Sequence, residues 1–257
     1  MEALTRSWPD LAALVVFLLA WLTYEPILRR LARGRHVINA DMVVVRRAWM
    51  GRMMERPELR LLDSQLMGHA LNSASFFASS NLILIAGAAG ALFGGDRALR
   101  VIEGTPLLAE APPLLFALKL SLIAATLARG LLSFIWAIRQ LNYTVAVIGA
   151  APKHPAEAIK RSYAEATAEI LNPALSAFNA GVRDYYFALA AAAWLIGPLA
   201  FAVATVGAVG LLAWRQAASP AGAALRRVRA ILEAEAAAPP PPPPAEAPAA
   251  KAPAVEG

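Results

Sequence analysis

The sequence predicts an all-α integral membrane protein, a bundle of four transmembrane helices with cytoplasmic amphipathic helices. Of its 257 residues, 58% are hydrophobic and only 16% are charged, which is more apolar than soluble globular domains are. The apolar residues gather in long runs, and no stretch alternates as a half-buried strand does. The chain contains no cysteine, so disulfide scaffolds and thiolate metal sites are excluded.

Four runs are long enough to cross a bilayer as helices, which takes about 20 mostly apolar residues. They cover residues 11–28, 74–93, 114–138 and 185–214. The last run contains Gly197-Pro198, and it is too long for one upright crossing and too short for two, so we expect one kinked or tilted helix. We assign the four spans to a domain at 1–232, and the Pro- and Ala-rich composition of 233–257 predicts a disordered tail.

The distribution of basic residues predicts the orientation, because cytoplasmic segments carry an excess of Lys and Arg. Segments 29–73 and 139–184 together hold fourteen, against eight in the segments on the other side. This difference places both long connections in the cytoplasm and both termini outside. Four arginines that follow the fourth run closely oppose this orientation: Arg215, Arg226, Arg227 and Arg229.

The two long connections are themselves expected to be helical. In the first, an apolar stripe at helical spacing consists of Ile38, Met42, Val45, Trp49 and Met53. Such a helix either lies on anionic lipid or packs against its neighbours. In the second, we expect a helix over 155–171 that ends at Asn172-Pro173, because Pro is favoured at the first position of a new helix.

Charged residues at membrane depth are costly and are therefore candidates for function. Arg129 lies about ten residues, ~15 Å along a helix, from the cytoplasmic end of the third run. We expect no acid at its depth, so its charge predicts a hydrated polar cavity open to the cytoplasm. Lys119 lies nearer the outer end of the same run, where we expect its side chain to extend to the interface.

A second set of candidate residues lies where the four runs meet the cytoplasmic interface. This interface cluster consists of Glu25, His69, Asn72, Ser75, Ser79, Arg139, Asn142, Tyr143, Asn179, Arg183, Asp184 and Tyr186. Glu25 and Asp184 are its acids, so we expect them to neutralise Arg139 and Arg183. Two interpretations stay open: hydrogen bonds that merely hold the helices together, or a vestibule for a ligand or ion.

No phosphate-binding loop, dinucleotide fingerprint or zinc-protease motif occurs in the chain. The sequence therefore predicts no cofactor, no metal site and no catalytic residue. Topology explains the positive charge, and no nucleic-acid partner is expected.

Four motifs, in order along the chain, carry a family resemblance: Arg47-Ala48-Trp49-Met50, Phe76-Phe77-Ala78-Ser79-Ser80, Trp136 to Tyr143 with Ile148 to Pro152, and Phe178 to Leu189. Over roughly residues 10–215 the chain resembles a bacterial membrane-protein family called domain of unknown function 599. The resemblance implies a multi-span helical protein of the bacterial inner membrane. It supplies no activity, ligand or catalytic residue.

Two functions fit these observations. The first is a transport- or channel-like bundle with a polar cavity at Arg129, which would form homo-oligomers because four helices are few for a pore. The second is a non-catalytic scaffold or accessory protein that binds lipid or another membrane protein through its basic cytoplasmic face. A membrane-embedded enzyme is a third alternative, and it lacks the paired acids or metal ligands that most chemistries need.

Overall fold

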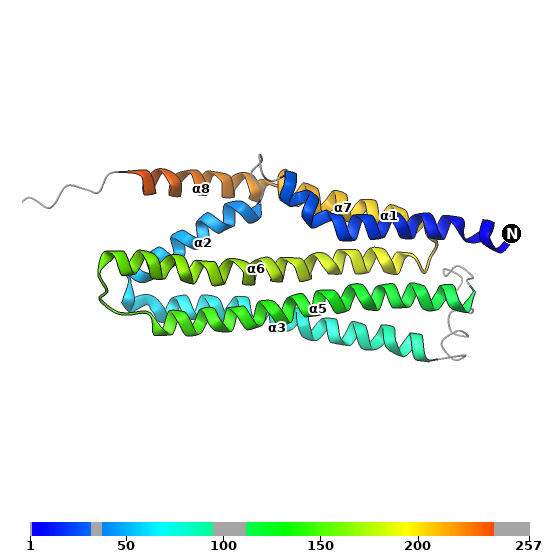
Figure 1. Cartoon of the computed structure of the whole chain (residues 1–257), viewed down its shortest axis with the longest axis horizontal. Helices are drawn as coiled ribbons and strands as arrows, with labels where there is room; N and C mark the ends of the chain where they lie inside the picture. Colours follow the sequence, from blue (N-terminus) through cyan, green and yellow to red (C-terminus); the bar gives the residue numbers. More distant parts are fainter. Residues whose placement is uncertain (1, 32–37, 95–111, 239–257) are drawn as a thin grey trace, which may run out of the picture.

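The computed structural model describes residues 2–31, 38–94 and 112–238, and all regular structure in these ranges is helical. The helices are α1 (Glu2–Leu31), α2 (Ile38–Glu55), α3 (Arg60–Phe93), α5 (Pro113–Ala150), α6 (Glu157–Ala193), α7 (Pro198–Ala217) and α8 (Pro220–Ala237), with a 3₁₀ turn η1 at Pro57–Leu59. They form one elongated bundle (Figure 1). The predicted all-α fold class is confirmed.

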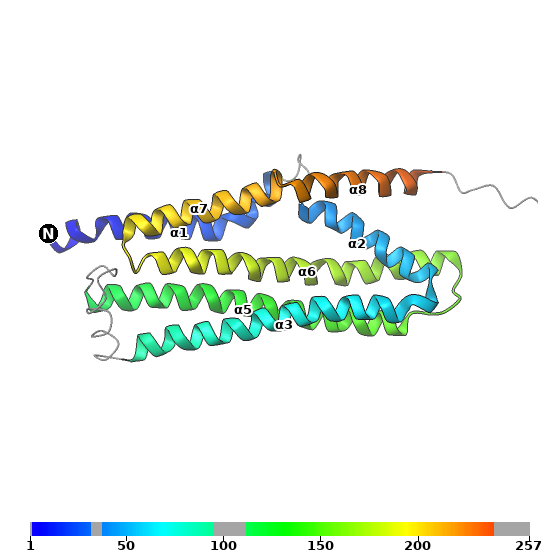
Figure 2. The same cartoon turned by 180° about the vertical axis from the view of Figure 1, so that it is seen from behind.

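Three long helices, α3, α5 and α6, run the length of the bundle, with α5 packed against the other two. We call the end where α1 begins the N-terminal end, and the opposite end the α8 end. At the N-terminal end α1 and α7 lie side by side, and α7 packs on α6; at the α8 end α2 packs on α6 and α8 (Figures 1 and 2).

Four stretches are long and apolar enough to cross a membrane: Trp8–Ile27, Pro57–Phe93, Pro113–Ala150 and Pro198–Ala237. Large apolar side chains face outward on these helices, including Ile83, Leu132, Leu199 and Val206, each more than 60% exposed. Apolar surface on this scale is typical of a protein that lies in lipid. The expectation of a membrane bundle is thus supported by both the length and the surface of the helices.

The prediction of one kinked helix over 185–214 is wrong. Helix α6 ends at Ala193, the chain turns, and α7 starts at Pro198 and runs back toward the α8 end (Figure 1). Gly197 has φ +157°, a conformation that side-chain-bearing residues rarely adopt, and Pro198 occupies the first helical position. The same dipeptide that was expected to kink one helix therefore separates two antiparallel helices.

Two smaller predictions also need correction. Asn172-Pro173 does not end a helix, since α6 continues through Pro173; packing against α5 and α2 on its flanks outweighs the local preference of proline. Helix α8 extends to Ala237, past the boundary expected at 232. The Pro-rich tail from residue 239 onward lies outside the described residues.

The bundle has two apolar cores, one at each end. At the α8 end, methionines of α2 and α3 pack on α5 and α6, with Met50, Met53 and Met67 almost fully buried. At the N-terminal end, aromatic residues of α1, α6 and α7 form the second core around Phe17, Trp194 and Phe201. The buried face of α2 therefore contains Met50 and Met53, and the helix packs on protein.

Candidate functional site

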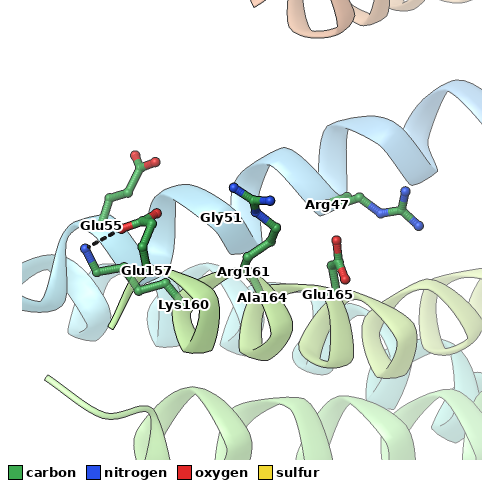
Figure 3. Close-up of a pocket in the computed structure, with 8 residues that line it drawn as sticks. All are labelled: Arg47, Gly51, Glu55, Glu157, Lys160, Arg161, Ala164 and Glu165. Carbon is green, nitrogen blue, oxygen red and sulfur yellow. Dashed lines mark hydrogen bonds and ion pairs between the residues drawn. The ribbon is translucent and has the colours of Figure 1, made fainter. Parts of the chain in front are cut away.

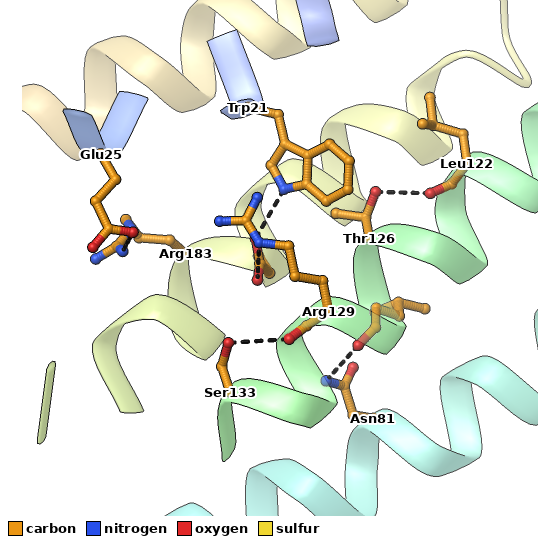
Figure 4. Close-up of polar contacts among 10 residues, drawn as sticks. Trp21, Glu25, Asn81, Leu122, Thr126, Arg129, Ser133 and Arg183 are labelled. Carbon is orange, nitrogen blue, oxygen red and sulfur yellow. Dashed lines mark hydrogen bonds and ion pairs between the residues drawn. The ribbon is translucent and has the colours of Figure 1, made fainter. Parts of the chain in front are cut away.

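A buried ion pair joins α5 to α6 near the middle of the bundle. Nε of Arg129 lies 3.6 Å from Oδ2 of Asp184, whose side chain is 2% exposed. The other carboxylate oxygen, Oδ1, accepts a 2.9 Å hydrogen bond from the indole N–H of Trp21 on α1. The guanidinium of Arg129 lies over that same indole ring, 4.9 Å from its centroid, so cation, acid and ring form one unit (Figure 4).

Arg129 thus points into the bundle, as expected, but the prediction that no acid lies at its depth is wrong. Reading 185–214 as one helix placed Asp184 at the membrane interface. Because α6 instead ends at Ala193, Asp184 lies nine residues before the end of its helix, ~14 Å along the axis. That brings Asp184 to the level of Arg129.

A small residue lets the helices approach closely at this point. A Cβ added to Gly130 would lie 3.1 Å from Cβ of Asp184 and 3.1 Å from Nδ2 of Asn81. Asn81, on α3, donates a hydrogen bond of 3.1 Å to the carbonyl of Leu127. The absence of a side chain at Gly130 therefore allows Asp184 and Asn81 to meet next to Arg129.

A second ion pair lies one residue away along α6. Arg183 donates a 2.9 Å hydrogen bond to Oε2 of Glu25 on α1, one of the two acids that the sequence offered as its counter-ion. The two pairs interact, because Arg183 and Glu25 both act electrostatically on Asp184. We call Trp21, Glu25, Arg129, Arg183 and Asp184 the central cluster (Figure 4).

Three buried oxygen atoms in and beside the central cluster form no hydrogen bond with any described residue: Oδ2 of Asp184, Oδ1 of Asn81 and the hydroxyl of Tyr24. Leaving a buried polar group without a partner costs about 1–3 kcal/mol. The central cluster is therefore not arranged for maximum stability.

The rest of the predicted interface cluster does not join the central cluster. His69, Asn72, Ser79, Arg139, Asn142 and Tyr143 are exposed on α3 and α5, and Ser75 is half-buried. Arg139 bonds to the Tyr143 hydroxyl at 2.7 Å, so its predicted pairing with an acid is wrong. Asn179 bonds Asn39 at 3.0 Å, and Tyr186 accepts from Arg215.

Lys119 does not extend to an interface, contrary to the prediction. Its side chain is buried, 2% exposed, and its ammonium lies 5.8 Å from the centroid of the Trp194 ring. The aromatic residues Trp21 and Trp194 were missed because apolar runs are normally rich in them. The one sequence signal was that both carry an N–H group that needs an acceptor when it is buried.

A pocket of about 270 Å³ opens between α2 and α6 at the α8 end. Its charged lining is balanced between three bases, Arg47, Lys160 and Arg161, and three acids, Glu55, Glu157 and Glu165 (Figure 3). None of these residues belongs to the central cluster. This pocket is therefore separate from the hydrated cavity predicted at Arg129, which stays a prediction. In the described ranges no three His, Asp or Glu gather to hold a metal ion.

Comparison with known proteins gives a family without an assigned activity. The family model described as "Protein of unknown function, DUF599" matches residues 12–221. No curated protein and no solved structure shows significant similarity to the chain. The matched range includes every residue of the central cluster.

Proposed function

The chain belongs to the DUF599 family, whose model covers most of its length, and we propose that it is a transport-like protein of the inner membrane that moves a small anion together with a proton. The central cluster is the proposed binding site. The main support for this proposal is the position of Asp184, an acid at membrane depth. Its carboxylate lies 3.6 Å from its cation, Arg129, which is beyond hydrogen-bonding distance.

The depth of the cluster follows from the length of α7. Its 20 residues measure about 30 Å, the thickness of the hydrocarbon core. The last turns of α6 lie beside α7 at the same level (Figures 1 and 2). We therefore take the second half of α6 as a fifth crossing, with Arg183 and Asp184 near its middle and other helices around it.

Five crossings put the start of α1 and the end of α8 on opposite sides of the membrane, in place of the same-side termini expected from four. The four arginines from the last turn of α7 onward, which opposed the orientation expected from four crossings, agree with this one. Eighteen Lys and Arg residues belong to the α8 side, against Arg6, Arg97 and Arg100 on the other. Under the positive-inside rule the N-terminus is outside and α8 is cytoplasmic.

The geometry supports a site that binds an anion at Arg129 when Asp184 is neutral and releases it when Asp184 is charged. A proton added to Oδ2 of Asp184 neutralises the acid and leaves the Arg129 guanidinium without its counter-ion. An arginine cannot release its own proton, so the freed cation attracts an anion. The surrounding helices cover the Arg129 side chain only in part, since 37% of it is exposed, so the protein does not close this cation off. Proton and anion then enter and leave as a neutral pair, which lowers the cost of crossing the bilayer.

The alternative role as a scaffold that binds through a basic face is less well supported. Several arginines of the first long connection already bond within the chain: Arg52 pairs with Glu235 at 2.8 Å, and Arg60 donates to the carbonyls of Ala151 and Pro152. Arg46 is buried. These contacts stabilise the α8 end and reduce the free positive surface. Homo-oligomers remain part of the proposal, because the outward apolar faces leave room for a second copy.

Purified protein in liposomes with an entrapped pH dye tests this function. We expect external acid with chloride or phosphate to acidify the interior faster than in protein-free liposomes, and faster than with the large anion gluconate. Asp184→Asn and Arg129→Met should both reduce the rate to the protein-free level.

Asp63→Asn is the matched control, because Asp63 is also buried and also accepts an indole hydrogen bond, from Trp49 at 2.7 Å, but lies at the α8 end. The proposal fails if the wild-type chain acidifies the interior no faster than empty liposomes. It fails equally if Asp184→Asn retains the wild-type rate.

A further inference from the structure

A second buried charge cluster lies nearer the N-terminal end of the bundle. The indole N–H of Trp194, the residue directly after α6, donates a 2.7 Å hydrogen bond to Oδ1 of Asp10 on α1. Lys119 on α5 lies over the same ring, and Asp10 acts on it electrostatically. We call Asp10, Lys119 and Trp194 the N-terminal cluster.

The N-terminal cluster repeats the arrangement of the central one with the helices exchanged. In the central cluster α1 supplies the indole and α6 the acid; in the N-terminal cluster α1 supplies the acid and the residue that caps α6 supplies the indole. In both, α5 supplies a cation that lies over the indole ring. The two cations are ten residues apart, ~15 Å along α5. The same three helices therefore build the same charge unit at two depths.

Aromatic rings fill the space between the two units. Trp194 stacks on Phe201 at 4.8 Å, Phe201 contacts Phe17 at 5.0 Å, and Phe17 contacts Trp21 at 6.0 Å, measured between ring centroids. Phe17 and Phe201 are fully buried. An ion cannot pass these apolar rings without a displacement of α1 or α7, so they separate the clusters.

Structural support alone does not explain Lys119. Its side chain is 2% exposed, yet no acid of the described residues lies within 4.0 Å of its ammonium. A buried cation without a directly bonded acid is destabilising, and a leucine at this position would fill the space more favourably. Lys119 and Asp10 are joined only through Trp194, whose ring lies under the cation and whose N–H bonds the acid.

We propose that the N-terminal cluster is a second binding station for the same proton and anion, reached from the outer side, with the aromatic rings as the barrier between the two stations. This inference rests on the proposed function. Protonation of Asp10 frees Lys119 for the anion at the outer station. When the proton and the anion then pass the aromatic barrier, Asp184 takes up the proton and Arg129 the anion.

The test uses the double variant Asp10→Asn/Lys119→Met in the liposome assay. Removing both charges together leaves neither stranded, so the protein should fold, as judged by a monodisperse elution profile and an unchanged melting temperature in detergent. Acidification should nevertheless fall to the protein-free level. Asp63→Asn again serves as the control that keeps the wild-type rate.

The outcomes separate the two proposals. If Asp184→Asn abolishes transport while the folded double variant retains the wild-type rate, the outer station is wrong and the proposed function stands. If the double variant abolishes transport while Asp184→Asn does not, the central site is wrong and the transport path runs through the outer cluster alone. If the wild-type chain transports nothing, both proposals fall.

Discussion

The two members of the Arg129–Asp184 pair should not contribute equally to stability. Arg129→Met leaves the Asp184 carboxylate buried, 2% exposed, with a single hydrogen bond from Trp21. Removing one partner of a buried pair costs about 3–5 kcal/mol, and this variant should lose that amount. Asp184→Asn instead leaves a guanidinium that the protein covers only in part, 37% exposed, and that still lies over the Trp21 ring. This cation–π contact, worth about 1–2 kcal/mol, offsets part of the same cost, so the loss should be smaller.

Reversible unfolding in mixed detergent micelles measures these free energies. We expect the order wild type, Asp184→Asn, Arg129→Met from most to least stable. The double variant Arg129→Met/Asp184→Asn should recover most of the larger loss, because no charge is left unpaired. Equal losses for the two single variants, or a double variant as unstable as the sum of both, would refute the assignment of this pair.

The remaining predictions concern packing and the buried charge at the α8 end. Gly181→Ala should lower the free energy of unfolding by about 1–3 kcal/mol, because the new Cβ would lie 2.6 Å from the fully buried Phe134 ring. Gly149→Ala is its control on α5: nothing lies within 4 Å of that Cβ, so unfolding curves should show no loss. Arg46→Met should leave stability unchanged or raise it, because burial lowers the pKa of Arg46 to about 10 and its Nε forms no hydrogen bond with a described residue. A lowered pKa of a base means that the fold disfavours its charge, so unfolding curves should show Arg46→Met to be at least as stable as the wild type; a clear loss of stability would contradict this.

Much of the fold could be predicted from the sequence because lipid imposes a simple rule on composition. The apolar runs that contain Val15, Ile83 and Leu132 identified α1, α3 and α5, since an apolar run of this length with so few charges has few alternatives. This rule did not identify α6 as a membrane helix. Its second half contains Arg183 and Asp184, which other helices cover, so its hydropathy resembles that of an amphipathic surface helix.

The incorrect prediction of one helix over 185–214 also put the candidate site in the wrong place. Treating Gly197-Pro198 as a kink placed Asp184 at the interface and left Arg129 without an acid. The sequence named Glu25 and Asp184 as counter-ions for Arg139 and Arg183 without assigning the pairs, and the structure pairs Glu25 with Arg183. Pairs that depend on a cross-helix contact in the bundle interior, such as Trp21 with Asp184, were not visible, because hydropathy along one helix does not specify which faces meet.

The most direct test of the account is the number of times that the chain crosses the membrane between residues 154 and 228. Since the chain has no cysteine, single cysteines can be introduced at exposed His154, Ile196 and Val228 and labelled in sealed vesicles with a membrane-impermeant thiol reagent. We expect positions 154 and 228 to react from the cytoplasmic side and position 196 only from the outside. Reaction of 154 and 196 from the same side would show that the second half of α6 does not cross, and the central cluster would not lie within the bilayer.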